Sequence, residues 1–109
     1  MTRKAKPAAS RSHEEATVES FRKDPKFAAE YLNAVLEDGE QEEVLSALRR
    51  MATAFGGVPK LAAEAELNAT TLYRTLSPKG NPELKSLTAL LRALGMQLAV
   101  RPLPRKRMA

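Results

Sequence analysis

The residues best suited to bind another molecule lie in a short segment, residues 58–79. Thr70, Tyr73 and Arg74 recur at three- and four-residue spacing, so they fall on one face of a helix predicted over residues 69–76. Arginine can donate two hydrogen bonds to a guanine edge or to a phosphate, and threonine offers a base both a hydroxyl and a methyl group. The pattern predicts a helix face that reads base edges in the major groove of DNA.

Other polar residues of this segment could support that face. Asn68 is a good N-cap, because its side chain can accept from the free backbone N–H groups of a first helical turn. Lys60 and Lys79 flank the helix in sequence, where their charges could meet phosphates. Ser77 follows the helix and is predicted to point outward. The residues predicted to contact DNA are Lys60, Asn68, Thr70, Thr71, Tyr73, Arg74, Ser77 and Lys79.

A helix-turn-helix over residues 58–76 would position these side chains. Helices joined by a three- to four-residue turn at a steep angle bring their backbones close, and the small Ala62 and Ala65 suit that approach. Leu72 is predicted to point inward. Glu66 occupies a turn position often held by glycine, and a left-handed glutamate costs on the order of 1 kcal/mol. The alternative for this segment is a pair of ordinary amphipathic helices in a bundle.

Two longer helices are predicted before this motif. Asp24 followed by Pro25 is typical of a helix start, with aspartate as N-cap and proline at the first helical position. Gly39 is predicted to end that helix in a left-handed cap, and a second helix follows over residues 40–55. Their predicted core-facing residues are Phe27, Ala28, Tyr31, Leu32, Val35 and Leu36, then Val44, Leu45, Leu48, Met51, Ala52 and Phe55.

A last helix and a strand are predicted after the motif. Asn81-Pro82 repeats the aspartate-proline start and predicts a helix whose apolar side begins at Leu84. Apolar and polar residues then alternate over residues 97–101, which favours a short strand. A lone strand leaves its hydrogen bonds unmade. We therefore expect it to pair with the same strand of a second copy, giving a homodimer.

The whole chain reads as one all-α domain between two basic tails. We predict a disordered basic arm over residues 1–20, the helix-turn-helix domain over 21–103 and a basic tail over 104–109. The 109 residues carry 18 Lys and Arg against 13 Asp and Glu, a formal net charge of +5. A basic chain of this size fits a nucleic-acid partner.

Composition argues against an enzyme. The chain has no cysteine and one histidine, His13 in the predicted arm, so we expect no catalytic residue, no metal site and no cofactor. No apolar run approaches the length of a membrane span. A cytoplasmic location is compatible with the absence of cysteine.

The chain also resembles a known family, the predicted addiction-module antidotes. These are Xre/Cro-type regulators, also known as DNA-binding prophage proteins, and they include HigA-like antitoxins. The resemblance spans residues 21–103. It rests on AEYLNAVLEDG at residues 29–39, LAAEAELNATTLYRTLS at 61–77, GNP at 80–82 and LLRALGMQLAV at 90–100.

This resemblance implies a lambda-repressor-like five-helix domain that binds operator DNA as a dimer. It further implies a neighbouring toxin of the RelE/ParE type, which the protein neutralises while repressing its own operon. Two other functions remain open at this point. One is a stand-alone prophage-type repressor without a toxin, and the other is an interaction module that blocks a toxin without reading DNA.

Overall fold

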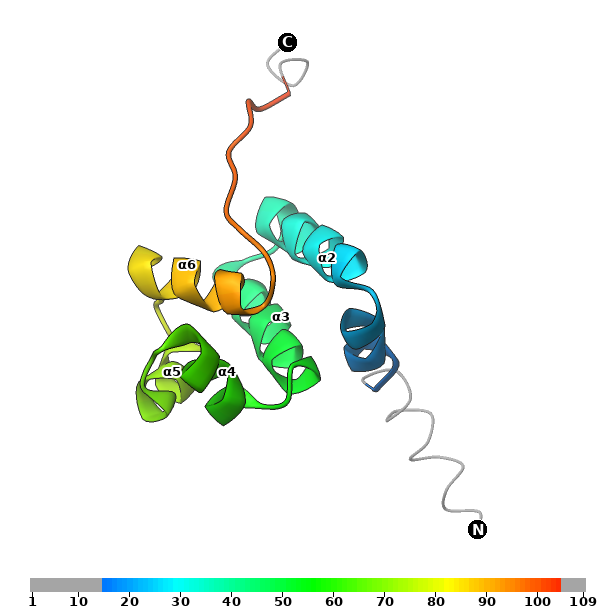
Figure 1. The fold of residues 1–109 in the computed structure, drawn as a ribbon. Helices are drawn as coiled ribbons and strands as arrows, with labels where there is room; N and C mark the ends of the chain where they lie inside the picture. Colours follow the sequence, from blue (N-terminus) through cyan, green and yellow to red (C-terminus); the bar gives the residue numbers. More distant parts are fainter. Residues whose placement is uncertain (1–14, 105–109) are drawn as a thin grey trace.

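The computed structural model describes residues 15–104, and within them every regular element is helical. The labelled helices are α2 (Pro25–Asp38), α3 (Gln41–Ala54), α4 (Val58–Ala65), α5 (Ala69–Thr75) and α6 (Leu84–Ala93). α3 lies at the centre, with α2 on one side and α4 on the other (Figure 1). α4 in turn packs against both α5 and α6. His13 and most of the predicted basic arm lie outside the described residues.

The predicted start of α2 is confirmed. The helix also ends at Gly39 as predicted, but the left-handed conformation predicted for this glycine is wrong. The carboxylate of Asp24 accepts from the N–H groups of Lys26 and Phe27 at 3.1 and 3.2 Å. Gly39 does end the helix, yet its backbone is extended, at φ −88° and ψ 168°, rather than left-handed. A Cβ there would lie 2.8 Å from the carbonyl oxygen of Val35. Glycine is needed because the chain passes too close to α2, and not because of a positive φ.

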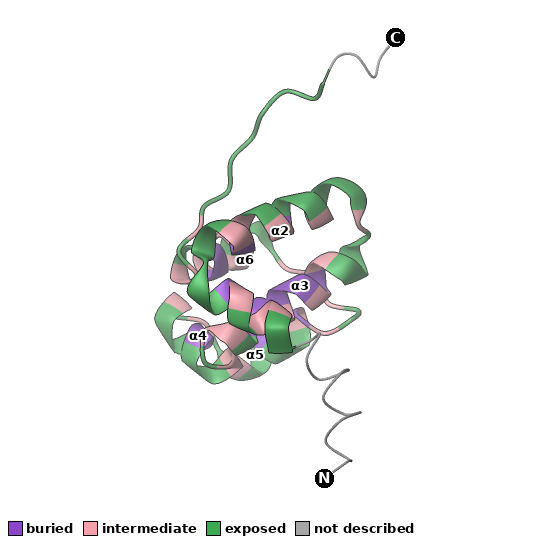
Figure 2. Cartoon of the chain, turned by 90° about the vertical axis from the view of Figure 1, so that its right-hand side faces the viewer, coloured by how far each residue is buried: buried purple, intermediate pink, exposed green. Residues whose placement is uncertain are grey.

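Leucine, methionine and alanine side chains fill the core between the helices. α3 is the most buried of the labelled helices, and Figure 2 shows its buried stretches in purple. Two of the predicted core leucines lie instead at the surface, Leu36 at 50% and Leu84 at 70% exposure. Leu84 is the first residue of α6, so no preceding turn covers it. The buried residues are Phe21, Ala28, Leu32, Leu45, Ala47, Leu48, Met51, Ala52, Leu61, Ala62, Leu72, Leu76, Leu90 and Leu91.

The prediction of a disordered arm is wrong for residues 15–20, because residues 15–23 form a helix. Phe21 is buried and anchors this helix, with its ring centroid 5.7 Å from that of Phe27 and 5.1 Å from that of Tyr31. The guanidinium of Arg22 donates to the carbonyl of Ala54 at 3.3 Å. Burial of an aromatic ring and this tie to α3 hold the helix on the domain.

The segments around α6 also differ from the predictions. α6 starts at Leu84 with Glu83 as N-cap, two residues after Pro82. Proline disfavours the helical region for the preceding Asn81. Residues 81–83 are all coil. The stretch 97–101 is not a strand in the structure, and residues 97–104 run as an exposed segment past α2 (Figure 1). A strand needs a pairing partner, and the described part of this single chain supplies none.

Two negative findings apply to residues 15–104 alone. None of their helices combines the length and apolar character that a membrane crossing requires. Nor do they gather three or more His, Asp or Glu side chains in an arrangement that could hold a metal ion. Neither finding extends to the rest of the chain.

Candidate nucleic-acid interface

The turn between α4 and α5 has the hydrogen bonds of a Schellman motif. The N–H of Leu67 donates to the carbonyl of Ala62 at 2.8 Å, and the N–H of Glu66 donates to the carbonyl of Ala63 at 3.2 Å. Glu66 sits at φ 59° and ψ 43°, the left-handed conformation that glycine usually supplies. It is the only residue other than glycine with a positive φ in residues 15–104. The predicted backbone cost at Glu66 is therefore present, while the turn keeps its standard form.

α5 begins where the sequence predicts. The side-chain oxygen of Asn68 accepts from the N–H of Thr71 at 2.9 Å, which caps the helix. Leu72 is buried at 2% exposure and faces α4 and the core. These contacts leave one face of α5 to solvent. Its exposed residues are Thr70, Thr71, Tyr73 and Arg74.

This exposed face is polar and carries no competing interaction within the described residues. Neither the hydroxyls of Thr70 and Thr71 nor the guanidinium of Arg74 makes a hydrogen bond or ion pair there. Tyr73 is 57% exposed, a high value for an aromatic residue on a short helix. The structure therefore brings four of the predicted residues together on one surface whose donors and acceptors remain available.

Ser77 closes α5 in the structure, while its contact with DNA stays a prediction. Its hydroxyl donates to the carbonyl of Arg74 at 2.7 Å and its N–H donates to the same carbonyl at 3.2 Å, so it closes α5. The side chain is half-buried rather than turned fully outward. Lys79 lies two residues further along in a tight turn, where the N–H of Gly80 donates to the carbonyl of Ser77 at 2.8 Å. Lys79 is exposed beside the end of α5.

Two residues of α3 hold this turn, and sequence reasoning missed both. The amide nitrogen of Gln41 donates to the carbonyl of Gly80 at 2.9 Å, and the guanidinium of Arg49 donates to the carbonyl of Leu76. Together they tie the C-terminal end of α5 to the central helix. Both pairs are far apart in sequence, so no local pattern predicts them.

Gly80 completes this support. A Cβ on Gly80 would lie only 1.8 Å from the carbonyl oxygen of Thr75, so no other residue fits here without moving the turn. Serine, proline and glycine at the first, second and fourth positions of 77–80 form a common turn sequence. That signature could have predicted this turn, which follows directly on the predicted end of α5.

Lys60 belongs to α4 rather than to α5. It is exposed near the start of α4, and its Cδ would be 2.8 Å from a Cβ built on Gly56. It lines a cavity of about 270 Å³ together with residues of helix 15–23, α2, α3 and the end of α6. Its ammonium group makes no hydrogen bond or ion pair within residues 15–104. It therefore remains available to a flanking phosphate, although the structure does not place it beside Arg74.

Comparison with known proteins assigns the chain to a family. Residues 14–102 match the model of a family described as "Probable addiction module antidote protein", which covers most of the chain. The chain belongs to this family. The family is described as one of probable antidotes, so it implies a toxin as partner. The matched region contains all of the labelled helices and the exposed segment as far as residue 102.

A relative from another comparison gives no further functional information. An uncharacterized protein of Haemophilus influenzae is 34% identical over 70 residues, which is 64% of this chain and 71% of the relative. No solved structure matches the chain. The antidote family is thus the most specific assignment that the comparisons support.

Proposed function

We propose that this antidote is a sequence-specific DNA-binding protein that represses its own operon and neutralises a RelE/ParE-like toxin. The observation that carries the DNA half is the exposed polar face of α5, held by α4 on one side and by Gln41 and Arg49 at its end. Its fold would be the lambda-repressor-like helix-turn-helix of the Xre type. A recognition helix of this kind enters the major groove and reads bases with its outer side chains.

We divide the proposed roles of these residues between recognition of bases and contacts with phosphates. Arg74 and Thr70 lie one turn apart, so both can address one groove. Tyr73 and Thr71 extend the same surface, while Asn68 fixes the start of the helix. Lys79 and Lys60 would meet phosphates and add affinity without sequence preference.

We expect the protein to bind its operator as a homodimer, with two α5 helices about 34 Å apart. Support comes from the exposed C-terminal segment, in which Val100 is 98% and Leu98 43% exposed. No backbone hydrogen bond within the described residues involves positions 97–104. Pairing with the same segment of a second copy would satisfy both the apolar side chains and the backbone.

The dimer can be tested by lysine substitutions in the segment that we propose to pair as a strand. Side chains alternate between the two faces of a strand, so Leu98 and Val100 share one face and Ala99 lies on the other. Sedimentation of the wild type should show twice the chain mass. Leu98→Lys with Val100→Lys should give a monomer, and Ala99→Lys should remain dimeric. A wild-type monomer that binds DNA tightly contradicts the proposed dimer.

The DNA half can be tested on the operator region of the chain's own gene. Fluorescence anisotropy with this duplex and a scrambled duplex should show specific binding by the wild type. Arg74→Ala should cost about 1–3 kcal/mol on the operator and relax discrimination at one base position. An unchanged operator affinity, with normal thermal melting, would show that α5 does not read DNA. The chain would then be an interaction module.

A further inference from the structure

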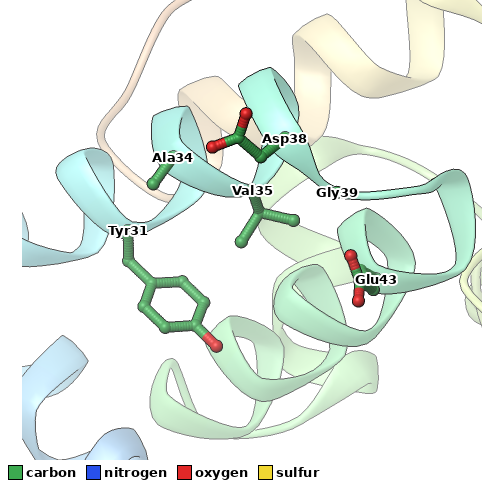
Figure 3. A pocket seen from close by; sticks show the side chains of 6 residues that line it. All are labelled: Tyr31, Ala34, Val35, Asp38, Gly39 and Glu43. Atoms are coloured by element: carbon green, nitrogen blue, oxygen red, sulfur yellow. The ribbon is translucent and has the colours of Figure 1, made fainter.

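A second surface of distinct chemistry lies where α2 turns into α3. α2 packs on α3 and on no other labelled helix, so it lies on the opposite side of α3 from α4 (Figure 1). A cavity of about 290 Å³ opens along it. We call this cavity the α2 groove. Figure 3 shows the residues that line it, which are Tyr31, Ala34, Val35, Asp38, Gly39 and Glu43.

The α2 groove combines an apolar lining with carboxylates. Tyr31, Ala34 and Val35 supply the apolar part from successive turns of α2 (Figure 3). Asp38 comes from the last turn of α2 and Glu43 from the first turn of α3. A lysine or arginine side chain would complement this lining. Its aliphatic stem can lie along an apolar surface while its charged head reaches polar groups.

The carboxylates at the C-terminal end of α2 interact unfavourably with the helix dipole. Glu37 and Asp38 occupy its last turn, and that turn contains no basic residue. Carboxylates are unfavourable at a helix C-terminus, where the dipole is negative and cations are favoured. Such a local conflict is expected where a site serves function rather than stability. Arg101 pairs with Glu37 at 2.8 Å, and a further cation beside Asp38 would relieve the rest.

Little of the negative charge around the α2 groove is paired within the described residues. Residues 27–48 contain six Asp and Glu and no Lys, Arg or His. Glu37 pairs with Arg101 at 2.8 Å, but Asp38 makes no hydrogen bond or ion pair within the described residues. One oxygen of Glu43 accepts from the N–H of Glu40 at 3.0 Å, which leaves its charge unpaired. This surface would repel DNA and attract a ligand of the opposite charge.

We propose that the α2 groove is the docking surface for the toxin, and that it takes a lysine or arginine side chain from a basic surface of that protein. The proposal rests on the toxin half of the proposed function, and on the family that implies a toxin. The cation's stem would lie on Tyr31, Ala34 and Val35, with its charge between the ends of α2 and α3. Because α2 and α5 lie on different sides of α3, toxin and DNA would bind separate faces.

The test uses the full chain and the protein encoded by the short reading frame adjacent to its gene. Binding is measured by titration calorimetry at physiological salt, and operator binding is measured in parallel. Asp38→Lys should weaken toxin binding about 10-fold or more, because it places a cation where the toxin's cation docks. Glu43→Gln keeps the oxygen that accepts from Glu40 and should weaken binding less. Neither variant should change operator affinity.

Two controls separate docking from folding and from overall charge. Lysine suits the C-terminal end of a helix, so Asp38→Lys should melt at the wild-type temperature or above it. Glu30→Lys makes the same charge change on α2 at an exposed residue that does not line the groove. It should retain nearly full toxin affinity. An equal loss in Glu30→Lys would mean that overall charge, and not the groove, governs binding.

The remaining outcomes distinguish this proposal from the function on which it rests. If the wild type binds the adjacent gene's product and Asp38→Lys binds it equally well, the docking proposal is wrong while the toxin half stands. If the wild type does not bind that product, the toxin half of the proposed function fails and the docking proposal fails with it. If Asp38→Lys instead changes the sedimenting mass, the groove is a contact between copies of this chain.

Discussion

The two faces of this small domain differ in charge and in how they are built. Residues 27–48, which run from the third residue of α2 through the first eight residues of α3, carry six acids and no Lys, Arg or His. Residues 67–104, which include α5 and α6, carry five Lys and Arg and a single acid. The C-terminal end of α5 is tied to α3 by hydrogen bonds. The α2 groove, in contrast, has carboxylates at the negative end of a helix dipole. This segregation would let one chain bind DNA and a basic protein without either ligand occupying the wrong face.

The largest expected effect comes from a substitution that removes the packing of α5 on the core. Leu72→Ala deletes the buried side chain that packs α5 on the core, and it should lower the free energy of unfolding by about 2–5 kcal/mol. Chemical denaturation measures this loss. Operator binding should fall with it, because α5 is no longer held. A loss below about 1 kcal/mol would mean that α5 is not docked as described.

A smaller effect should follow from crowding the turn after α5. Gly80→Ala forces a methyl group against the carbonyl of Thr75, and overpacking of this kind costs about 1–3 kcal/mol. Because the turn would shift, operator affinity should fall while toxin binding is unchanged. Gly95→Ala is a useful comparison, since a Cβ there meets no atom within 4 Å. Gly95 has φ 87°, so its cost should be purely one of backbone conformation, without loss of operator binding.

The flanking lysines should affect affinity but not sequence preference. Lys79→Ala and Lys60→Ala should each weaken operator and scrambled DNA nearly equally. Each should reduce the slope of log affinity against log salt by roughly one. Measurements at two salt concentrations give this slope. A change in base preference in either variant would show that the lysine reads sequence.

The smallest expected effect is a gain in stability. Glu66→Gly should raise the free energy of unfolding by about 1 kcal/mol, because glycine adopts the left-handed conformation without strain. Glu64→Gly is the matched control, since it places glycine within α4 and should lower stability by about 1 kcal/mol. Denaturation curves of the two variants should therefore move in opposite directions. A destabilising Glu66→Gly would show that the glutamate side chain makes a compensating contact.

The elements of the α5 face were largely predictable because their signals are local. The cap of Asn68 and the inward position of Leu72 each follow from a few neighbouring residues. The bounds of α4 and the left-handed Glu66 likewise come from short patterns. The all-α architecture followed in the same way from helical periodicity and caps.

The features that the sequence did not predict depend on contacts between residues that are far apart in the chain. The bond from Gln41 to Gly80 spans 39 positions, and the extended Gly39 results from the path of the chain past α2. The helix over residues 15–23 is short and held by tertiary packing of Phe21, so propensity alone does not reveal it. The α2 groove arises only when two helices meet, which no single stretch of sequence specifies.

The most direct test of the two-face account measures both ligands against one substitution on each face. Operator affinity and toxin affinity are determined for the wild type, Arg74→Ala, Asp38→Lys and the double variant. The account predicts that Arg74→Ala loses only operator affinity and Asp38→Lys loses only toxin affinity, with both losses additive in the double variant. If either single substitution lowers both affinities while the protein melts normally, the two ligands share a surface and the account is wrong.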